Sequence, residues 1–155
     1  MSLLKEKISF LGKGVDLSDD CYKLCKINAN KLGVSNRLKL FKSDIDNFNL
    51  GKYDLIISNP PYVKNFDLNK LDKDIKVYEP KMALAGGLDG LSSFRKIIDK
   101  SSELLKKQGK LILEIAHDQK EKVKQLLRTN SFYINSVVKD LANKDRCIIS
   151  TKIEK

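Results

Sequence analysis

The stretch 53–62 constrains the fold more than any other part of the chain, because it joins an apolar strand pattern to two consecutive prolines. Its first half places aliphatic side chains at successive positions, which is typical of a buried parallel strand. Pro60 and Pro61 each fix their own φ and lack a backbone donor. Asn59 is driven into an extended conformation because it precedes a proline. The sequence therefore predicts a stiff loop at the carboxyl end of a strand, where open α/β sheets bind their ligands.

The groups in this loop suit the binding of a planar amine. The Asn59 side chain offers a carbonyl acceptor and an amide donor, and the Pro60 carbonyl is a second acceptor. Two acceptors held side by side could take both hydrogens of an –NH2 group, while Tyr62 covers its flat face. The loop contains no nucleophile, and none is needed if the second substrate is a strong electrophile.

The remaining pattern alternates helices and strands. We expect a helix ending near residue 7, a strand over 12–18, and a helix that Ser18 caps and Gly33 ends. Further elements are expected over 37–42 (strand), 91–107 (helix), 110–116 (strand), 118–127 (helix), 132–138 (strand) and 146–151 (strand). This order predicts a mostly parallel α/β sheet, and the short link between the last two strands predicts an antiparallel hairpin. The polar segment 67–78 is a candidate flap over the site.

The quartet Asn59-Pro60-Pro61-Tyr62 after an apolar strand resembles the signature of amino-directed methyltransferases that use S-adenosyl-L-methionine. That class includes adenine-N6 DNA enzymes and protein glutamine-N5 enzymes. Later segments resemble the glutamine-N5 enzymes that modify class-1 peptide-chain release factors: Tyr78-Glu79-Pro80, the glycine-rich segment 83–91, Leu113-Glu114-Ile115 and Asp145-Arg146. The resemblance covers the chain from Asp16 to about Ile149. It implies a Rossmann-like class I methyltransferase fold, with a release factor as the protein substrate.

The resemblance also implies roles for individual residues. Asn59 and Pro60 would be catalytic, and Asn59, Pro60, Pro61 and Tyr62 would bind the substrate amide. Asp16 and Leu17 would hold the ribose end of the cofactor, Asp44 and Ile45 its adenine, and Asn59 would contact it as well. For Asp16 the alternative is a helix-capping acid, a role that Asp19 and Asp20 already supply. No metal is expected.

The chain departs from the resembled family at its beginning. That family opens its catalytic domain with a strand, an acid and a glycine-rich turn that approaches the cofactor, whereas Gly12-Lys13-Gly14 opens a strand instead. We therefore expect residues 1–155 to be an incomplete catalytic domain without the first strand and the N-terminal substrate domain. The absent strand would lie between those ending in Asp16 and Ser58. Its loss predicts free backbone edges and poor cofactor binding by this chain alone.

The net charge of +10 has two interpretations. Lysines spread over solvated surfaces would explain it, and so would a polyanionic partner such as RNA. Arginine, the usual residue of specific phosphate and base contacts, is scarce. An apolar run of the ~20 residues that a membrane span needs and a signal-peptide core are both lacking, which predicts the cytoplasm.

The cysteines and the single histidine give weaker signals. An odd number of cysteines without paired spacing argues against a disulfide framework or a zinc site. Cys21 and Cys25 lie four residues apart on an expected helix, and we expect them to be small buried residues. For His117, a structural or incidental role is favoured over general-base catalysis.

Two other functions stay open at this point. An adenine-N6 or other nucleic-acid amino methyltransferase would use the same loop and the basic surface, although the chain shows no separate target-recognition region. A non-catalytic remnant that acts as an interaction module would explain the missing glycine-rich turn.

Overall fold

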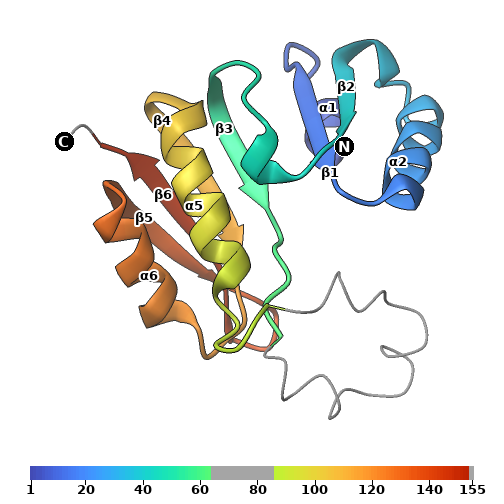
Figure 1. Ribbon diagram of the computed structural model, residues 1–155. Coiled ribbons are helices and arrows are strands. Elements are labelled where there is room, and N and C mark those ends of the chain that lie inside the picture. Colours follow the sequence, from blue (N-terminus) through green and yellow to red (C-terminus); the bar gives the residue numbers. More distant parts are fainter. Residues whose placement is uncertain (64–85, 154–155) are drawn as a thin grey trace. The chain divides into compact units, whose positions relative to one another are not determined.

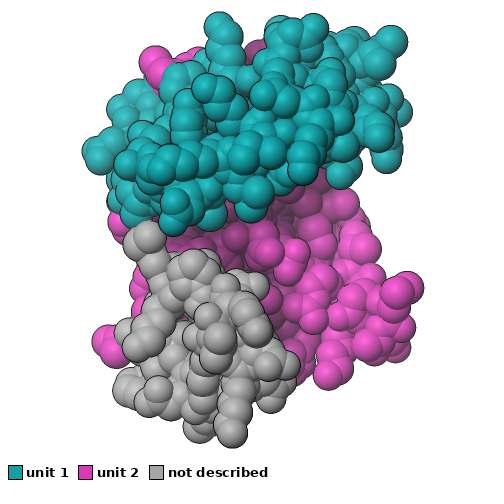
Figure 2. Space-filling model, turned by 90° about the vertical axis from the view of Figure 1, so that its right-hand side faces the viewer, with its two compact units in different colours: residues 1–49 teal, residues 50–155 magenta. Residues whose placement is uncertain are grey.

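The computed structural model describes residues 1–63 and 86–153, and its contacts divide the chain into two compact units. Unit 1 is Met1–Asn49 and unit 2 is Leu50–Lys155; they are coloured separately in Figure 2. The candidate flap over 67–78, the motif Tyr78-Glu79-Pro80 and the first part of the glycine-rich segment lie outside the described residues. Each unit is described by itself below.

Unit 1 is a small α/β unit built on two parallel strands. Its elements are α1 (Ser2–Glu6), β1 (Gly12–Asp16), α2 (Asp19–Lys31) and β2 (Leu38–Lys42), with short 3-10 helices at Ser35–Arg37 and Ile45–Asn47. The strands pair in parallel from Gly12 opposite Leu38 to Asp16 opposite Lys42. The predicted caps of α2 are confirmed, because the Ser18 hydroxyl accepts from the Cys21 amide at 3.3 Å and Gly33 follows the helix with φ +67°.

The core of unit 1 is small. Its buried members are Leu4, Ala29 and Val34, against which Leu32 and Leu38 pack. Ala29 is the only residue of α2 that is buried in this core. The prediction that Cys21 is buried is wrong, since Cys21 is exposed and Cys25 is only partly buried.

Unit 2 is a four-stranded sheet with two helices. Its elements are β3 (Tyr53–Ser58), α5 (Ser92–Leu104), β4 (Leu105–Glu114), α6 (Lys120–Thr129), β5 (Phe132–Lys139) and β6 (Asp145–Lys152). The strand order is β3-β4-β6-β5 (Figure 1). The pair β3–β4 is parallel, with Ser58 opposite Leu113, while β6 runs antiparallel to both β4 and β5. The predicted C-terminal antiparallel hairpin is therefore confirmed.

Both helices of unit 2 pack on the same face of its sheet (Figure 1). Phe94 and Ile98 of α5 and Val123 and Leu127 of α6 are fully buried there. The strands contribute Leu111, Leu113, Phe132 and Ile148 to the same cluster, and Ile115, directly after β4, also belongs to it. Alternate residues of β4 carry this packing, since side chains of a strand alternate between faces. This cluster is the main hydrophobic core of the chain's described part.

The strand β3 is parallel as predicted, but the prediction that it is buried is wrong. Tyr53 and Ile56 pack against the core, whereas Ile57 is 57% exposed. The reason is that α5 and α6 cover one face only, so a continuous aliphatic run leaves part of its side chains on the other face. Among the described residues, β3 pairs with β4 alone and β1 with β2 alone.

The helices α5 and α6 differ in extent from the helices predicted over 91–107 and 118–127. The helix α5 ends at Leu104, because Leu105 already belongs to β4, and Gln108 adopts φ +58° before Gly109. The helix α6 begins at Lys120, because residues 116–119 form a turn in which the backbone amide of Gln119 donates to the Ala116 carbonyl at 3.0 Å.

Candidate active site

The predicted loop directly follows β3 in unit 2. Asn59 is exposed, Pro60 is buried, and Pro61 and Tyr62 are partly buried. Within the described part of the chain, neither the Asn59 side chain nor the Pro60 carbonyl takes part in a hydrogen bond. The loop therefore presents an exposed side-chain amide next to a buried proline.

Tyr62 anchors the loop to the body of unit 2. Its side chain packs against the hydrophobic core, so covering a substrate's flat face stays a prediction for this ring. Its backbone lies against Gly86, where an added Cβ would be 2.9 Å from the Tyr62 Cα and carbonyl carbon. The Gly86 amide also donates to the Val63 carbonyl at 2.7 Å. Only glycine permits this close approach, which gives Gly86 a physical role that the sequence did not reveal.

Gln119 is the site residue that sequence reasoning missed. It lies beside this loop with 3% of its surface exposed, and its amide bonds to the Tyr62 carbonyl. The sequence carries no signal for it, because the exposed Gln125 of α6 is an identical residue in a similar polar context, whereas Gln119 directly precedes that helix. Only the fold separates the two glutamines.

Asp89 lies shortly before α5 and bonds to residues at its start. Its carboxylate accepts from the Leu91 amide at 3.0 Å and from the Arg95 guanidinium. The hydrogen bond from Arg95 and the Leu91 amide lower the pKa of Asp89 to about 2. The ionised carboxylate thus stabilises the start of α5.

We expect the stabilising effect of Asp89 to disappear in acid. Because its pKa is lower in the folded state than the ~3.9 of an unperturbed aspartate, its contribution is complete above pH ~4 and is lost as the pH falls toward 2. Urea unfolding of the wild type and of Asp89→Asn should differ at pH 6, and the gap should shrink at pH 2.5. A gap that stays constant over this range would contradict the role of the ionised carboxylate.

In unit 1, the residues predicted to hold a cofactor gather at one edge of the parallel pair. The Ser43 amide donates to the Asp16 carbonyl at 3.0 Å, which joins the ends of β1 and β2. Asp16 ends β1 and Leu17 follows it, while Asp44 and Ile45 come shortly after the end of β2. One carboxylate oxygen of Asp16 accepts from the Ser18 amide at 2.8 Å, and Asp44 accepts from the Asp46 amide at 3.1 Å. The structure thus brings these four residues together.

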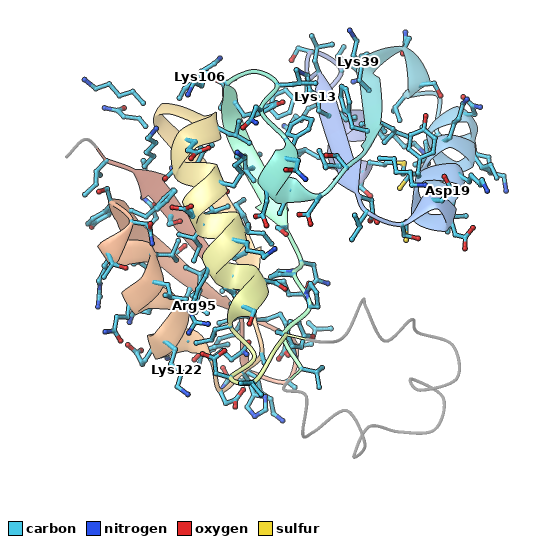
Figure 3. All side chains as sticks on the ribbon, in the orientation of Figure 1. Lys13, Asp19, Lys39, Arg95, Lys106 and Lys122 are labelled. Atoms are coloured by element: carbon cyan, nitrogen blue, oxygen red, sulfur yellow. The ribbon has the colours of Figure 1, made fainter. Side chains whose placement is uncertain are left out.

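Labelled lysines occur on β1, β2, β4 and α6, so the positive charge is spread over both units (Figure 3). Burial raises the pKa of the Cys25 and Cys147 thiols, which disfavours their nucleophilic thiolate forms. His117 is exposed. In the residues that the structure describes, no cluster of three or more histidine, cysteine or acidic side chains could hold a metal.

None of the described helices combines the length and apolarity required to span a bilayer.

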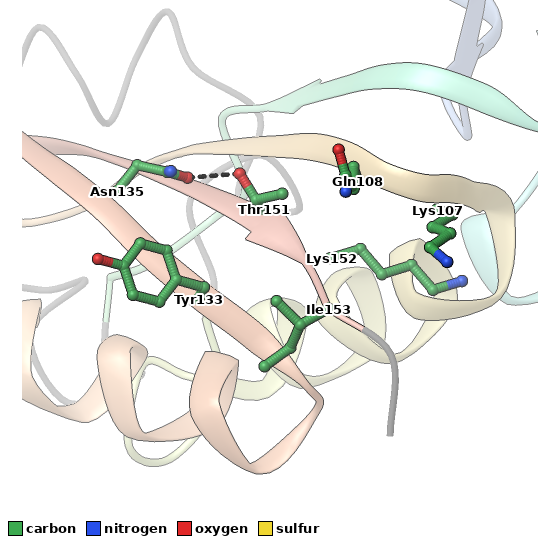
Figure 4. A pocket seen from close by; sticks show the side chains of 7 residues that line it. All are labelled: Lys107, Gln108, Tyr133, Asn135, Thr151, Lys152 and Ile153. Atoms are coloured by element: carbon green, nitrogen blue, oxygen red, sulfur yellow. Dashed lines mark hydrogen bonds between the residues drawn. The ribbon is translucent and has the colours of Figure 1, made fainter.

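A hollow of about 320 Å³ lies elsewhere on unit 2 (Figure 4). Its lining includes Tyr133 and Lys152, and the Thr151 hydroxyl donates to the Asn135 side chain there at 2.7 Å. Thr151 pairs with Lys110 on β4, whereas the loop begins beyond Ser58, which pairs with Leu113. The hollow is therefore at the opposite end of the sheet from Asn59.

Known proteins resemble this chain in sequence and in fold. A family model described as Eco57I restriction-modification methylase matches residues 6–138. The release factor glutamine methyltransferase of Clostridium botulinum is 39% identical over 140 residues, covering 88% of this chain and 50% of that protein. The same enzyme from Clostridium acetobutylicum is 34% identical, covering 88% of this chain and 49% of that protein. The chain thus spans about half the length of the curated relatives it matches.

A solved methyltransferase structure from Pyrococcus furiosus shares the fold, with a TM-score of 0.69 at 14% identity over 99% of this chain and 68% of that chain. The predicted Rossmann-like methyltransferase fold is confirmed by this likeness, and the predicted resemblance to release factor glutamine methyltransferases is confirmed by the sequence matches. Because the methylase family model covers most of the sequence, the chain belongs to the methylase family that this model describes.

Proposed function

We propose that this chain is the catalytic part of an S-adenosylmethionine-dependent methyltransferase that modifies the side-chain amide of a glutamine in a peptide-chain release factor. The observation that carries this proposal is the exposed Asn59 beside the anchored Pro60 at the carboxyl end of β3. The sequence similarity to release factor glutamine methyltransferases supports the choice of acceptor. The cytoplasmic location expected from the sequence belongs to the same proposal.

The cofactor would bind through the acids of unit 1. Each of Asp16 and Asp44 has one carboxylate oxygen engaged by a nearby backbone amide, which holds the carboxylate in place and leaves the other oxygen as an acceptor. Such acceptors suit the ribose hydroxyls and the adenine amino group respectively, with Leu17 and Ile45 as apolar neighbours. When bound, the cofactor supplies an electrophilic methyl group on a sulfonium.

The loop would then activate a poor nucleophile. The lone pair of a carboxamide nitrogen is delocalised into its carbonyl, so the nitrogen is unreactive in water. The Asn59 side-chain oxygen and the Pro60 carbonyl would accept its two hydrogens and hold it in a fixed orientation. These hydrogen bonds strengthen as the nitrogen becomes tetrahedral and positive, so they stabilise the transition state more than the ground state.

We further propose that residues outside this chain supply the glycine-rich turn of the cofactor site. Among the described residues, β1 pairs in a sheet only with β2 and β3 only with β4, which supports this idea. A chimera tests it: the part of the Clostridium botulinum relative that precedes the matched region is joined to Met1 of this chain. Isothermal titration should detect S-adenosylmethionine binding by the chimera and little by the chain alone. Equal binding by both would contradict the need for further residues.

The same chimera tests the substrate. Incubated with methyl-labelled S-adenosylmethionine, it should label a release factor, and replacing the acceptor glutamine of that factor by alanine should abolish the label. The Clostridium botulinum enzyme serves as the positive control. Transfer to neither protein nor nucleic acid, with an active control, would favour the interaction-module hypothesis.

A nucleic-acid amino methyltransferase is the second candidate. The description of the matching family model, Eco57I restriction-modification methylase, favours it, as does the net charge of +10. Duplex DNA and RNA are therefore included as acceptors in the same assay. Labelling of a nucleic acid without labelling of the release factor would replace the proposed function by this one.

A further inference from the structure

Gln119 is a buried amide whose hydrogen-bonding groups are all used. Its Nε2 donates to the Tyr62 carbonyl at 3.2 Å and to the Gly90 carbonyl at 3.1 Å. Its Oε1 accepts from the Ala116 amide at 3.2 Å. With 3% of its surface exposed, it is one of three buried polar residues in the described part of the chain, together with Ser101 and Ser150.

The three partners of Gln119 come from three different segments. Tyr62 follows β3, Gly90 precedes α5, and Ala116 follows β4. A neutral carboxamide combines two donors and an acceptor in one planar group, so a single side chain satisfies backbone groups of all three segments. The bond to Gly90 is buried and the other two are partly buried, so loss of the side-chain donors would leave the Tyr62 and Gly90 carbonyls without this partner at a cost in stability.

The bond to the Tyr62 carbonyl bears directly on the acceptor pair. Only Pro60 and Pro61 separate Tyr62 from Asn59, and both prolines have a fixed φ. A displacement of Tyr62 is therefore passed on to Asn59 and Pro60 instead of being absorbed by soft backbone torsions. Gly86 packs against the Tyr62 backbone, and its amide donates a hydrogen bond to the Val63 carbonyl. Gln119 bonds to Gly90 in the same segment 86–90, so it also holds the segment that supports the loop.

We propose that Gln119 is a positioning residue for methyl transfer: it holds the Asn59–Pro60 acceptor pair at the end of β3 by joining the Tyr62, Gly90 and Ala116 backbones. The catalytic meaning of this inference rests on the proposed function, whereas its structural part does not. The experiments below separate the two.

The first experiment uses the chain alone and needs no activity. Gln119→Met keeps the length and the volume of the side chain but removes its hydrogen bonds, and Gln125→Met is the matched control on the exposed face of α6. Hydrogen exchange of the Gly86 amide, which is bonded to the Val63 carbonyl, reports on the loop contact. We expect about 10-fold faster exchange in Gln119→Met and no change in Gln125→Met. Equal Gly86 exchange in both variants would overturn the proposal.

A second variant keeps the test valid if Gln119→Met does not fold. Gln119→Glu is isosteric, and as a carboxylate it faces two carbonyl oxygens, so its pKa should rise above the ordinary ~4.3. Once protonated, the introduced carboxyl group can donate to one carbonyl. The amide resonances of Val63 and Gly86 should then shift toward wild-type positions as the pH falls, with a midpoint at this raised pKa. Asp89 and Asp140 have lowered pKa values, so their titration cannot produce a midpoint above ~4.3. Resonances that do not titrate would overturn the proposal.

The catalytic part is tested in the chimera described above. Gln119→Met should lower kcat on the order of 100-fold while KM for S-adenosylmethionine stays close to that of Gln125→Met. An unchanged kcat, or an increase in KM alone, would overturn the positioning role. If the unmutated chimera transfers no methyl group to a release factor, the proposed function fails, and the Gly86 exchange still decides whether Gln119 holds the loop.

Discussion

Replacing Asn59 by alanine is expected to reduce methyl transfer by the chimera by roughly 10²–10³-fold. The change removes one of the two acceptors that would orient the substrate amide and stabilise the charge that develops on its nitrogen. Because these interactions strengthen in the transition state, the loss should fall on kcat more than on KM for the release factor. The measurement is steady-state transfer of labelled methyl groups at saturating cofactor.

This expectation can be separated from damage to the fold. Asn59 is exposed, so its replacement should change the free energy of unfolding by no more than ~0.5 kcal/mol. Asn36→Ala, at another exposed asparagine, is the matched control and should retain full activity. Unchanged turnover in Asn59→Ala would refute the catalytic role of the loop.

The second large effect is expected at the centre of unit 2. Leu113 is 0% exposed and lies on β4 between Ser58 of β3 and Ile148 of β6. Leu113→Ala should lower the free energy of unfolding by about 2–5 kcal/mol, because it removes buried methyl groups and leaves a cavity. That is a large part of the ~5–15 kcal/mol that holds a typical domain together.

Urea unfolding monitored through amide resonances of β4 and β6 measures this change within unit 2. Leu141→Ala is the matched control, since Leu141 is fully exposed in the turn between β5 and β6, and its midpoint should stay within experimental error of the wild type. Similar midpoints for the two leucine variants would show that the cluster around Leu113 does not dominate the stability of unit 2.

Local signals in the sequence were sufficient for most of the elements. Ser18 and Gly33 set the ends of α2 because capping depends on groups a few residues apart. The parallel strand β3 and the hairpin of β5 and β6 likewise followed from pattern and link length. These features depend on neighbours in the sequence, so a single chain contains the information.

Features that depend on distant packing were not predictable. The exposure of Ile57 depends on which face of the sheet α5 and α6 cover, and the exposure of Cys21 depends on how little of α2 is buried. The hydrogen bonds of Gln119 to three separate segments can be recognised only once the fold is known. At the candidate site, the sequence therefore predicts residues that would face the substrate, but it gives no sign of the contacts that Gln119 and Gly86 make with the loop.

Under the proposed function, the acidic edge of unit 1 would have a consequence for the release of the spent cofactor. Asp16, Asp44 and Asp46 lie near this edge, in a chain whose net charge is +10. A sulfonium donor loses its positive charge when the methyl group departs, and the demethylated thioether is left uncharged at that sulfur. Local carboxylates would therefore attract the donor more strongly than the spent cofactor, to an extent that salt screening limits. This difference would help to relieve product inhibition.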